Sequence, residues 1–90
     1  MTRTWALELA SARITVNAIA PGPISTEAFE ITNPAGHVRT EKLLSTIPIG
    51  RIGMPEEIAH AAAYLLDHRA EFMTGQTLFI DGGLSIGASL

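Results

Sequence analysis

Two hydroxyl side chains follow a short apolar stretch of this sequence, at a point where the chain must turn. The stretch covers residues 14–20, and the residues after it are Pro21, Gly22, Pro23, Ile24, Ser25 and Thr26. In open α/β sheets, ligands bind outside the carboxyl ends of the strands. A strand that stops and is followed at once by hydroxyl groups is therefore the first candidate for a ligand-binding site.

The local chemistry explains why a strand would end here. Residues 14–20 are mostly β-branched or small apolar residues, which is typical of a strand buried on both faces of a parallel sheet. Pro21 and Pro23 lack the amide donor that a strand uses, and Gly22 permits a turn that most residues resist. An ordinary strand-ending turn that contacts no ligand explains these residues as well.

A second motif has the spacing of a serine nucleophile. Residues 83–87 match the Gly-x-Ser-x-Gly pattern of a nucleophile elbow, which requires an acid and a histidine later in the chain. Only three residues follow Gly87, and none of them is Asp, Glu or His. The match therefore predicts no nucleophile.

Histidines and paired glutamates form no recognisable site either. His60 and His68 share one predicted helix but lack the i, i+3 or i, i+4 spacing that converges on a metal ion, and His37 lies in a loop. Glu56 and Glu57 could act as an acid/base pair, but the helix dipole already explains both of them in a first helical turn. The sequence thus predicts no metal site and no complete catalytic set.

The composition limits the class of protein. Ninety residues form one domain at most, yet 47% of them are hydrophobic, which indicates a slice of a larger core. There is no cysteine for a disulfide, and six scattered basic residues with a net charge of −3 form no basic stripe for nucleic acid. No apolar run has membrane-spanning length, and no signal peptide is recognisable. We therefore expect a cytoplasmic protein that binds neither nucleic acid nor membrane.

The chain is predicted to begin with a helix over residues 1–13. Trp5, Leu9 and Ala12 recur there at the spacing of one helical face, which predicts that they are buried. No polar segment leads into Trp5, so we expect the native helix to start upstream and Met1 to be an internal residue of a longer protein.

Residues 27–50 are the least regular part of the sequence. Residues 33–36 (Asn-Pro-Ala-Gly) are typical of a turn, and residues 38–47 are predicted to form a short helix. Irregular segments next to a site often cover it. A substrate-covering segment and a plain surface excursion are both consistent with these residues.

The clearest helix is predicted over residues 54–70, with Pro55 at its first position. Its predicted buried stripe consists of Ile58, Ala61, Ala62, Leu65 and Leu66. The alanines that widen this face are Ala59, Ala63 and Ala70. The width indicates two neighbouring elements, and a merely alanine-rich helix explains it as well. A strand over residues 76–80, ended by residues 81–83, completes a helix–strand–loop–helix–strand order that is typical of α/β sheets.

Three stretches in this order resemble the short-chain dehydrogenase/reductase family. They are residues 17–26 (Asn-Ala-Ile-Ala-Pro-Gly-Pro-Ile-Ser-Thr), residues 51–59 (Arg-Ile-Gly-Met-Pro-Glu-Glu-Ile-Ala) and residues 74–83, which run from Thr-Gly-Gln to Asp-Gly-Gly. The resemblance covers essentially all 90 residues and looks strongest toward the 3-oxoacyl-carrier-protein-reductase-like branch. It implies that residues 1–90 are the carboxyl-terminal third of a dinucleotide-binding domain, part of a Rossmann-type doubly wound parallel sheet.

The resemblance implies an activity for the intact protein. Members of the family are NAD(P)-dependent oxidoreductases, which transfer a hydride between the nicotinamide of NAD or NADP and a small-molecule carbonyl or alcohol substrate. The family's glycine-rich loop, catalytic serine and Tyr-x-x-x-Lys pair do not occur here, since His68 stands four residues after Tyr64. We therefore expect this chain to supply no catalytic residue and to be inactive alone.

The resemblance also assigns cofactor-binding residues. The turn of Pro21 and Gly22 would lie against the nicotinamide. The main chain of Ile24 would contact the carboxamide, and the Thr26 hydroxyl would form a hydrogen bond nearby. Residues 27–50 would form the substrate-covering loop.

Asn17 and the alanine face of the helix over residues 54–70 have predicted roles outside the ligand site. Asn17 is expected to satisfy backbone groups rather than to contact a ligand. Similarity to the family implies a homo-oligomer, a dimer or tetramer, whose contact would use Ala59, Ala63 and Ala70 beside the last strand. The rival hypothesis is a non-catalytic remnant or oligomerisation module, and codons for Tyr-x-x-x-Lys upstream of Met1 would distinguish the two.

Overall fold

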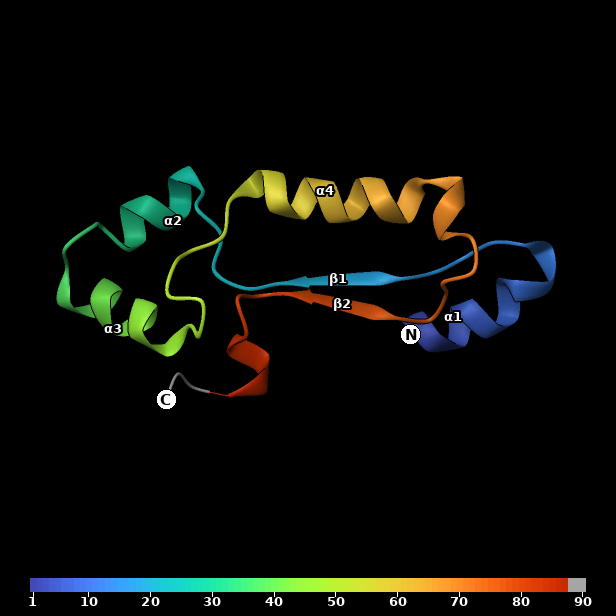
Figure 1. Ribbon diagram of the computed structural model, residues 1–90, viewed down its shortest axis with the longest axis horizontal. Coiled ribbons are helices and arrows are strands. Elements are labelled where there is room, and N and C mark those ends of the chain that lie inside the picture. Colours follow the sequence, from blue (N-terminus) through green and yellow to red (C-terminus); the bar gives the residue numbers. More distant parts are fainter. Residues whose placement is uncertain (88–90) are drawn as a thin grey trace.

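A two-stranded parallel sheet is the centre of the structure (Figure 1). The computed structural model describes residues 1–87. Its strands are β1 (Ala18–Pro21) and β2 (Thr77–Ile80), its helices are α1 (Thr2–Leu9), α2 (Glu27–Thr32), α3 (Val38–Thr46) and α4 (Pro55–Leu66), and 3₁₀ turns cover Ala10–Ala12, His68–Ala70 and Leu84–Ile86. This order confirms the predicted α/β class. The last three residues of the predicted 1–90 unit lie outside the described residues.

The register of the two strands runs from the pair Ala18 and Thr77 to the pair Pro21 and Ile80. Pro21, predicted to stop the strand, is instead its last residue. Ala18 donates to the Gln76 carbonyl at 2.9 Å and Gly22 donates to the Ile80 carbonyl at 3.0 Å. Only alternate backbone amides of β1 point toward β2. The position of the missing amide at Pro21 points away from β2, so no hydrogen bond between the strands is lost.

Asn17 bonds to backbone groups, as predicted, and thereby fixes this register, although it lies just before β1 rather than inside it. Its side-chain nitrogen donates to the Met73 carbonyl at 3.0 Å, and its side-chain oxygen accepts from the Gln76 amide at 3.1 Å. The Val16 amide beside it donates to the Thr74 hydroxyl at 3.0 Å. Asn17 and Thr74 together therefore tie the entry of β1 to the entry of β2.

The helix α1 buries a different face from the predicted one. Ala6 is buried, whereas Trp5 is 50% exposed and Leu9 and Ala12 are also exposed. Ala6 lies beside Gly75, where an added Cβ would be 3.4 Å from the Ala6 Cβ. The predicted burial of Trp5 is therefore wrong for the described residues, because the chain approaches β2 through its smallest side chain.

The predicted helix over residues 54–70 is divided in two. The helix α4 ends at Leu66, and Asp67 takes an extended conformation while its carboxylate accepts from the Arg69 amide at 2.8 Å to begin the next turn. Leu66 is 88% exposed, so its place in the predicted buried stripe is wrong. Ala70 is buried at 4% exposure and belongs to the 3₁₀ turn rather than to α4.

Residues 27–50 are more regular than predicted, because they contain α2 as well as α3. The Thr26 hydroxyl accepts from the Phe29 amide at 3.1 Å and thereby begins α2, with Glu27 in its first turn. The predicted turn at residues 33–36 is confirmed by a bond from the His37 amide to the Pro34 carbonyl at 3.2 Å. The predicted helix over residues 38–47 is confirmed as α3.

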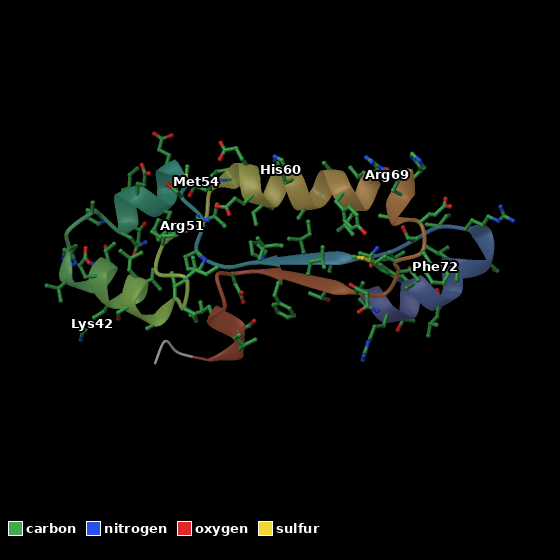
Figure 2. All side chains as sticks on the ribbon, in the orientation of Figure 1. Lys42, Arg51, Met54, His60, Arg69 and Phe72 are labelled. Carbon is green, nitrogen blue, oxygen red and sulfur yellow. The ribbon has the colours of Figure 1, made fainter. Side chains whose placement is uncertain are left out.

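The described chain is elongated. Its radius of gyration is 16.1 Å, with extents of 51 × 27 × 21 Å, whereas a compact domain of this length would have about 12 Å. Figure 1 shows α4 along one side of the sheet, and α2 and α3 beyond the carboxyl ends of the strands. Among the described residues, only Ala6, Ile47 and Ala70 are buried apolar residues, and Phe72 is fully exposed (Figure 2). Among residues 1–87, no helix has the length and apolarity to cross a membrane.

Loss of the Asn17 side chain should destabilise the fold. Asn17→Ala removes two hydrogen bonds, one part-buried and one exposed, each worth about 0.5–1.5 kcal/mol, so the free energy of unfolding should fall by about 1–3 kcal/mol. Urea unfolding of the full-length protein measures this change. Gln76→Ala is the control, because its exposed side chain makes only a 3.4 Å contact. An Asn17→Ala protein as stable as the control would contradict the register role.

Candidate functional site

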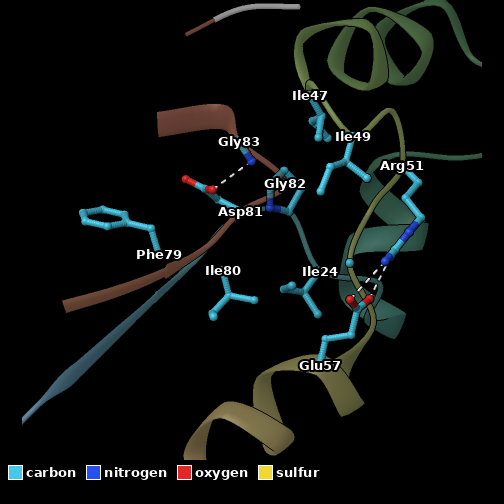
Figure 3. A pocket seen from close by; sticks show the side chains of 12 residues that line it. Ile24, Ile47, Ile49, Arg51, Glu57, Phe79, Ile80, Asp81, Gly82 and Gly83 are labelled. Carbon is cyan, nitrogen blue, oxygen red and sulfur yellow. Dashed lines mark hydrogen bonds and ion pairs between the residues drawn. The ribbon is translucent and has the colours of Figure 1, made fainter. Parts of the chain in front are cut away.

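A cleft of about 310 Å³ lies where β1 and β2 end (Figure 3). Its lining residues are Pro23, Ile24, Ile47, Ile49, Arg51, Gly53, Glu57, Phe79, Ile80, Asp81, Gly82 and Gly83. They come from the last residues of β2, from the turns after both strands, from the segment after α3 and from the start of α4. The position agrees with the prediction that a ligand site would lie at the carboxyl ends of the strands.

The turn after β2 joins the cleft to the segment that follows α3. The Ile49 amide donates to the Gly82 carbonyl at 3.0 Å. Gly82 has a φ of +65°, and an added Cβ there would come within 2.8 Å of the Ile47 side chain. A larger residue at Gly82 would therefore be strained and would also push the two segments apart. This contact connects residues 27–50 to the sheet.

Asp81 organises the same turn. Its two carboxylate oxygens accept from the amides of Ser85 and Gly83, each at 3.0 Å. Hydrogen bonding by the Ser85 side chain, with smaller contributions from the amides of Gly83 and Ser85, lowers the pKa of Asp81 below its ordinary value. A carboxylate held charged by its own turn is a structural group, not a proton donor at neutral pH.

Gly22 is required for a different reason from the predicted one. It does not have a positive φ, so the turn itself does not demand glycine. An added Cβ would instead lie 2.8 Å from both the Cα and the Cβ of Asp81. Glycine is needed because the turns after β1 and β2 touch backbone to backbone at this point.

Ile24 lines the cleft, and its main-chain donor and acceptor form no hydrogen bond with the described residues. Ile24 forms a parallel bridge with Gly53, in which the Ser25 amide donates to the Gly53 carbonyl at 2.8 Å and the Gly53 amide donates to the Pro23 carbonyl at 3.0 Å. Both bonds use the neighbours of Ile24. Its own N–H and C=O therefore face away from Gly53, and no described residue bonds to either. One donor and one acceptor are thus available to a ligand.

An ion pair closes the cleft on the side of α4. The Arg51 guanidinium donates to both carboxylate oxygens of Glu57, at 2.7 and 3.0 Å, and the Met54 amide donates to the first of these oxygens at 3.0 Å. The hydrogen bond from Arg51, followed by the one from Met54, lowers the pKa of Glu57 to about 2. Glu57 therefore fixes the start of α4 and is not suited to act as a general base.

The predicted site residues occupy different places. Ile24 lines the cleft, whereas Pro21, Gly22 and Thr26 are not among its lining residues. Pro21 ends β1, and Gly22 packs against Asp81. The oxygen of Thr26 accepts the capping bond of α2, and its hydroxyl proton has no acceptor among the described residues.

Sequence reasoning missed most of the lining of the cleft. Arg51 and Glu57 were separate features of the sequence, and only folding pairs them. No histidine lines the cleft, and residues 1–87 contain no group of side chains suited to hold a metal ion. The glycines after β2 were the one available signal, since a Gly-Gly pair after a strand permits close approach of another segment.

Parallel strands with a helix on one side and a cleft beyond their carboxyl ends are features of Rossmann-type α/β proteins. The family model described as enoyl-(acyl-carrier-protein) reductase matches residues 1–85. The chain belongs to the short-chain dehydrogenase/reductase family, which confirms the predicted resemblance and fold class.

Individual relatives agree with this assignment. The chain is 46% identical over 88 residues to 3β-hydroxysteroid dehydrogenase 1 of Eggerthella lenta, and 46% identical over 86 residues to a 3-oxoacyl-(acyl-carrier-protein) reductase of Thermotoga maritima. Each match covers 96% of this chain, but only 33% and 34% of the two relatives. The chain therefore spans about a third of the length of the curated relatives it matches.

Solved structures give the same result. A dehydrogenase from Agrobacterium tumefaciens, solved with bound NADP, superposes with a TM-score of 0.86 at 40% identity over 94% of this chain and 34% of its own. A mutant short-chain dehydrogenase/reductase of Serratia marcescens superposes with a TM-score of 0.82 at 42% identity over 93% of this chain and 33% of its own.

The ion pair at the cleft should make stability depend on pH. The pKa of Glu57 is lowered from 4.5 to about 2 in the folded state, so its stabilising contribution is complete above about pH 4.5 and is lost as the pH falls toward 2. The difference in unfolding free energy between wild type and Glu57→Gln should shrink across this window. Urea unfolding at several pH values measures it.

Glu56→Gln is the matched control, because Glu56 forms no ion pair with a described residue. The difference in unfolding free energy between wild type and Glu56→Gln should change less over the same pH range. If the difference in unfolding free energy between wild type and Glu57→Gln is constant from pH 5 to pH 2, the lowered pKa assigned to Glu57 is wrong.

Proposed function

We propose that this chain forms the nicotinamide side of the active site of an NAD(P)-dependent oxidoreductase. The bound nicotinamide would supply or accept the hydride that is exchanged with a carbonyl or alcohol carbon. The observation that carries the proposal is the main chain of Ile24, whose N–H and C=O meet no described residue at the edge of the cleft. A carboxamide has one donor and one acceptor group to match them.

The other proposed cofactor-binding residues support this position. Pro21 and Gly22 hold the turn in place, since Gly22 packs against Asp81 at the carboxyl end of the sheet. Thr26 has a hydroxyl proton left to donate once its oxygen caps α2. The NADP bound by the Agrobacterium tumefaciens structure, which is 40% identical to this chain, makes NAD or NADP the cofactor of choice.

Residues 27–50 are proposed to cover the substrate. Their two helices extend beyond the carboxyl ends of the strands (Figure 1), and the bond from Ile49 to Gly82 anchors them to the cleft. A small-molecule carbonyl or alcohol would then lie between this segment and the nicotinamide. The substrate is proposed only to this class.

Proton transfer is proposed to use residues outside this chain. Tyr64 is the single tyrosine of the sequence, and it lies on α4, half exposed and outside the lining of the cleft. The chain alone is therefore proposed to be inactive, and the intact protein to be a cytoplasmic enzyme.

A homo-oligomer is proposed for the intact protein, with a corrected interface. Ala59 and Ala63 are exposed on α4 and suit a close helix contact, whereas Ala70 is buried and is removed from the proposed contact. Among the described residues β2 pairs only with β1, so its second edge is open. An assembly that binds no cofactor would favour the rival function as an oligomerisation module.

Thr26→Ala in the full-length protein should weaken NAD(P)H binding by roughly two- to tenfold, as expected for one neutral hydrogen bond of about 0.5–1.5 kcal/mol. Fluorescence titration of the cofactor measures the Kd. Thr26→Ser keeps both the cap of α2 and the hydroxyl, and should bind like wild type. Thr26→Asp keeps a cap acceptor but has no proton to donate, and should not restore binding. An unchanged Kd in Thr26→Ala would contradict the assignment.

Ala63→Glu should dissociate the oligomer, because it places a charge in a contact between small side chains. Light scattering at micromolar concentration measures the mass. Ala12→Glu, at an exposed alanine outside α4, is the control and should leave the mass unchanged. A monomeric wild-type protein, or an Ala63→Glu protein of unchanged mass, would refute the interface.

A further inference from the structure

A second cavity, of about 470 Å³, lies between α2 and α3. It is separated from the cleft by the bridge of Ile24 and Gly53, whose residues line the cleft. The second cavity is lined instead by Ser25, which follows Ile24, and by Ile52, which precedes Gly53. Successive side chains of extended backbone point to opposite faces, so the bridge forms a wall with one cavity on each side.

The polar side chains that line this cavity are two carboxylates, an amide and two hydroxyls, and the Ser25 hydroxyl already donates to one oxygen of Glu30 at 2.8 Å. Glu30 on α2 and Glu41 on α3 contribute carboxylates, and Asn33 uses its amide nitrogen on the Phe29 carbonyl, at 3.2 Å, which leaves its side-chain oxygen unused among the described residues. Among the described residues, no lysine, arginine or histidine lines the cavity. Figure 2 shows Lys42 pointing away from α2. A negatively charged ligand is therefore disfavoured.

Thr40 provides a second and independent observation. It lies on α3, is only 4% exposed and lines the cavity, and its hydroxyl oxygen has no hydrogen-bond partner among the described residues. A buried polar group without a partner costs free energy, and most such groups in native proteins are satisfied. A ligand hydroxyl could both donate to and accept from this group.

The distribution of these groups favours one class of ligand. A single ammonium presents its donors at one point, whereas the acceptors here are spread over two helices. The remaining wall is apolar, with Phe29, Leu44 and Ile52, and would pack against carbon atoms. We propose that the cavity between α2 and α3 binds an uncharged polyol or sugar, whose hydroxyl groups reach Thr40 and the acceptors of both helices.

The proposed site is independent of the proposed cofactor site, and the two isoleucines on opposite sides of the bridge report on them separately. In full-length protein labelled at isoleucine methyl groups, sorbitol should shift the Ile52 signal in a saturable way and leave Ile24 unchanged. NADPH or NADH should shift Ile24 and leave Ile52 unchanged. If NADPH and NADH leave the Ile24 signal unchanged while sorbitol still shifts the Ile52 signal, the result counts against the proposed function and not against this site.

Three probes with similar hydroxyl groups test the charge selectivity. Sorbitol is neutral, gluconate adds a carboxylate and glucamine adds an amine. We expect sorbitol to bind more tightly than either charged analogue. The absence of a saturable Ile52 shift with sorbitol would overturn the proposal, and so would tighter binding of gluconate or of glucamine.

Variants of Thr40 test the role of the buried hydroxyl. Thr40→Val should weaken sorbitol binding by roughly two- to tenfold, and Thr40→Ser should retain it. Thr46→Val is the control, because the Thr46 hydroxyl is exposed on the same helix and donates to the Leu43 carbonyl at 2.7 Å. If Thr40→Val stabilises the protein against urea but leaves sorbitol binding unchanged, the hydroxyl is a structural defect and the proposal is wrong.

Discussion

The parallel register of β1 and β2 is the constraint on which the rest of the structure depends. Two strands of four residues offer few hydrogen bonds, and a slip of one residue would turn every side chain to the opposite face. Asn17 prevents this slip by bonding to the Met73 carbonyl and the Gln76 amide before the strands begin. With the register fixed, both strands end together, and the turns after them meet where Gly22 touches Asp81.

The cleft follows from this meeting of turns. Glycines at positions 22 and 82 allow the turns after β1 and β2 to approach each other and the segment after α3. In the bridge between Ile24 and Gly53, the hydrogen bonds to Gly53 are formed by Pro23 and Ser25. The N–H and C=O of Ile24 itself form no hydrogen bond with the described residues. One short bridge thus leaves a donor and an acceptor unpaired on a residue that lines the cleft, and it also divides the cleft from the cavity between α2 and α3.

Local signals predicted β2, the start of α4 at Pro55 and the backbone role of Asn17, because each depends on residues close in sequence. The strand predicted from residue 14 begins only at Ala18, and Ile14 is 49% exposed, so its predicted burial was wrong. The helix α2 could have been predicted from Thr26 as an N-cap followed by acidic residues, and was missed because residues 27–50 looked irregular as a whole. The burial of Trp5 was wrong because burial depends on neighbours distant in sequence. The predicted reason for glycine at position 22 was also wrong, because the contact with Asp81 that requires glycine joins residues distant in sequence.

Hydrogen exchange of single amides in the full-length protein, with and without NAD(P)H, tests the central claim most directly. The amides of Ser25 and Gly53 are bonded within the bridge, whereas the Ile24 amide has no partner among the described residues. The Ile24 amide should therefore exchange fast in the free protein and at least tenfold more slowly with cofactor bound, as expected for a gain of about 1.4 kcal/mol or more, while Ser25 and Gly53 stay protected throughout. An Ile24 amide that is already as protected as Gly53, or whose exchange the cofactor does not change, would contradict the account.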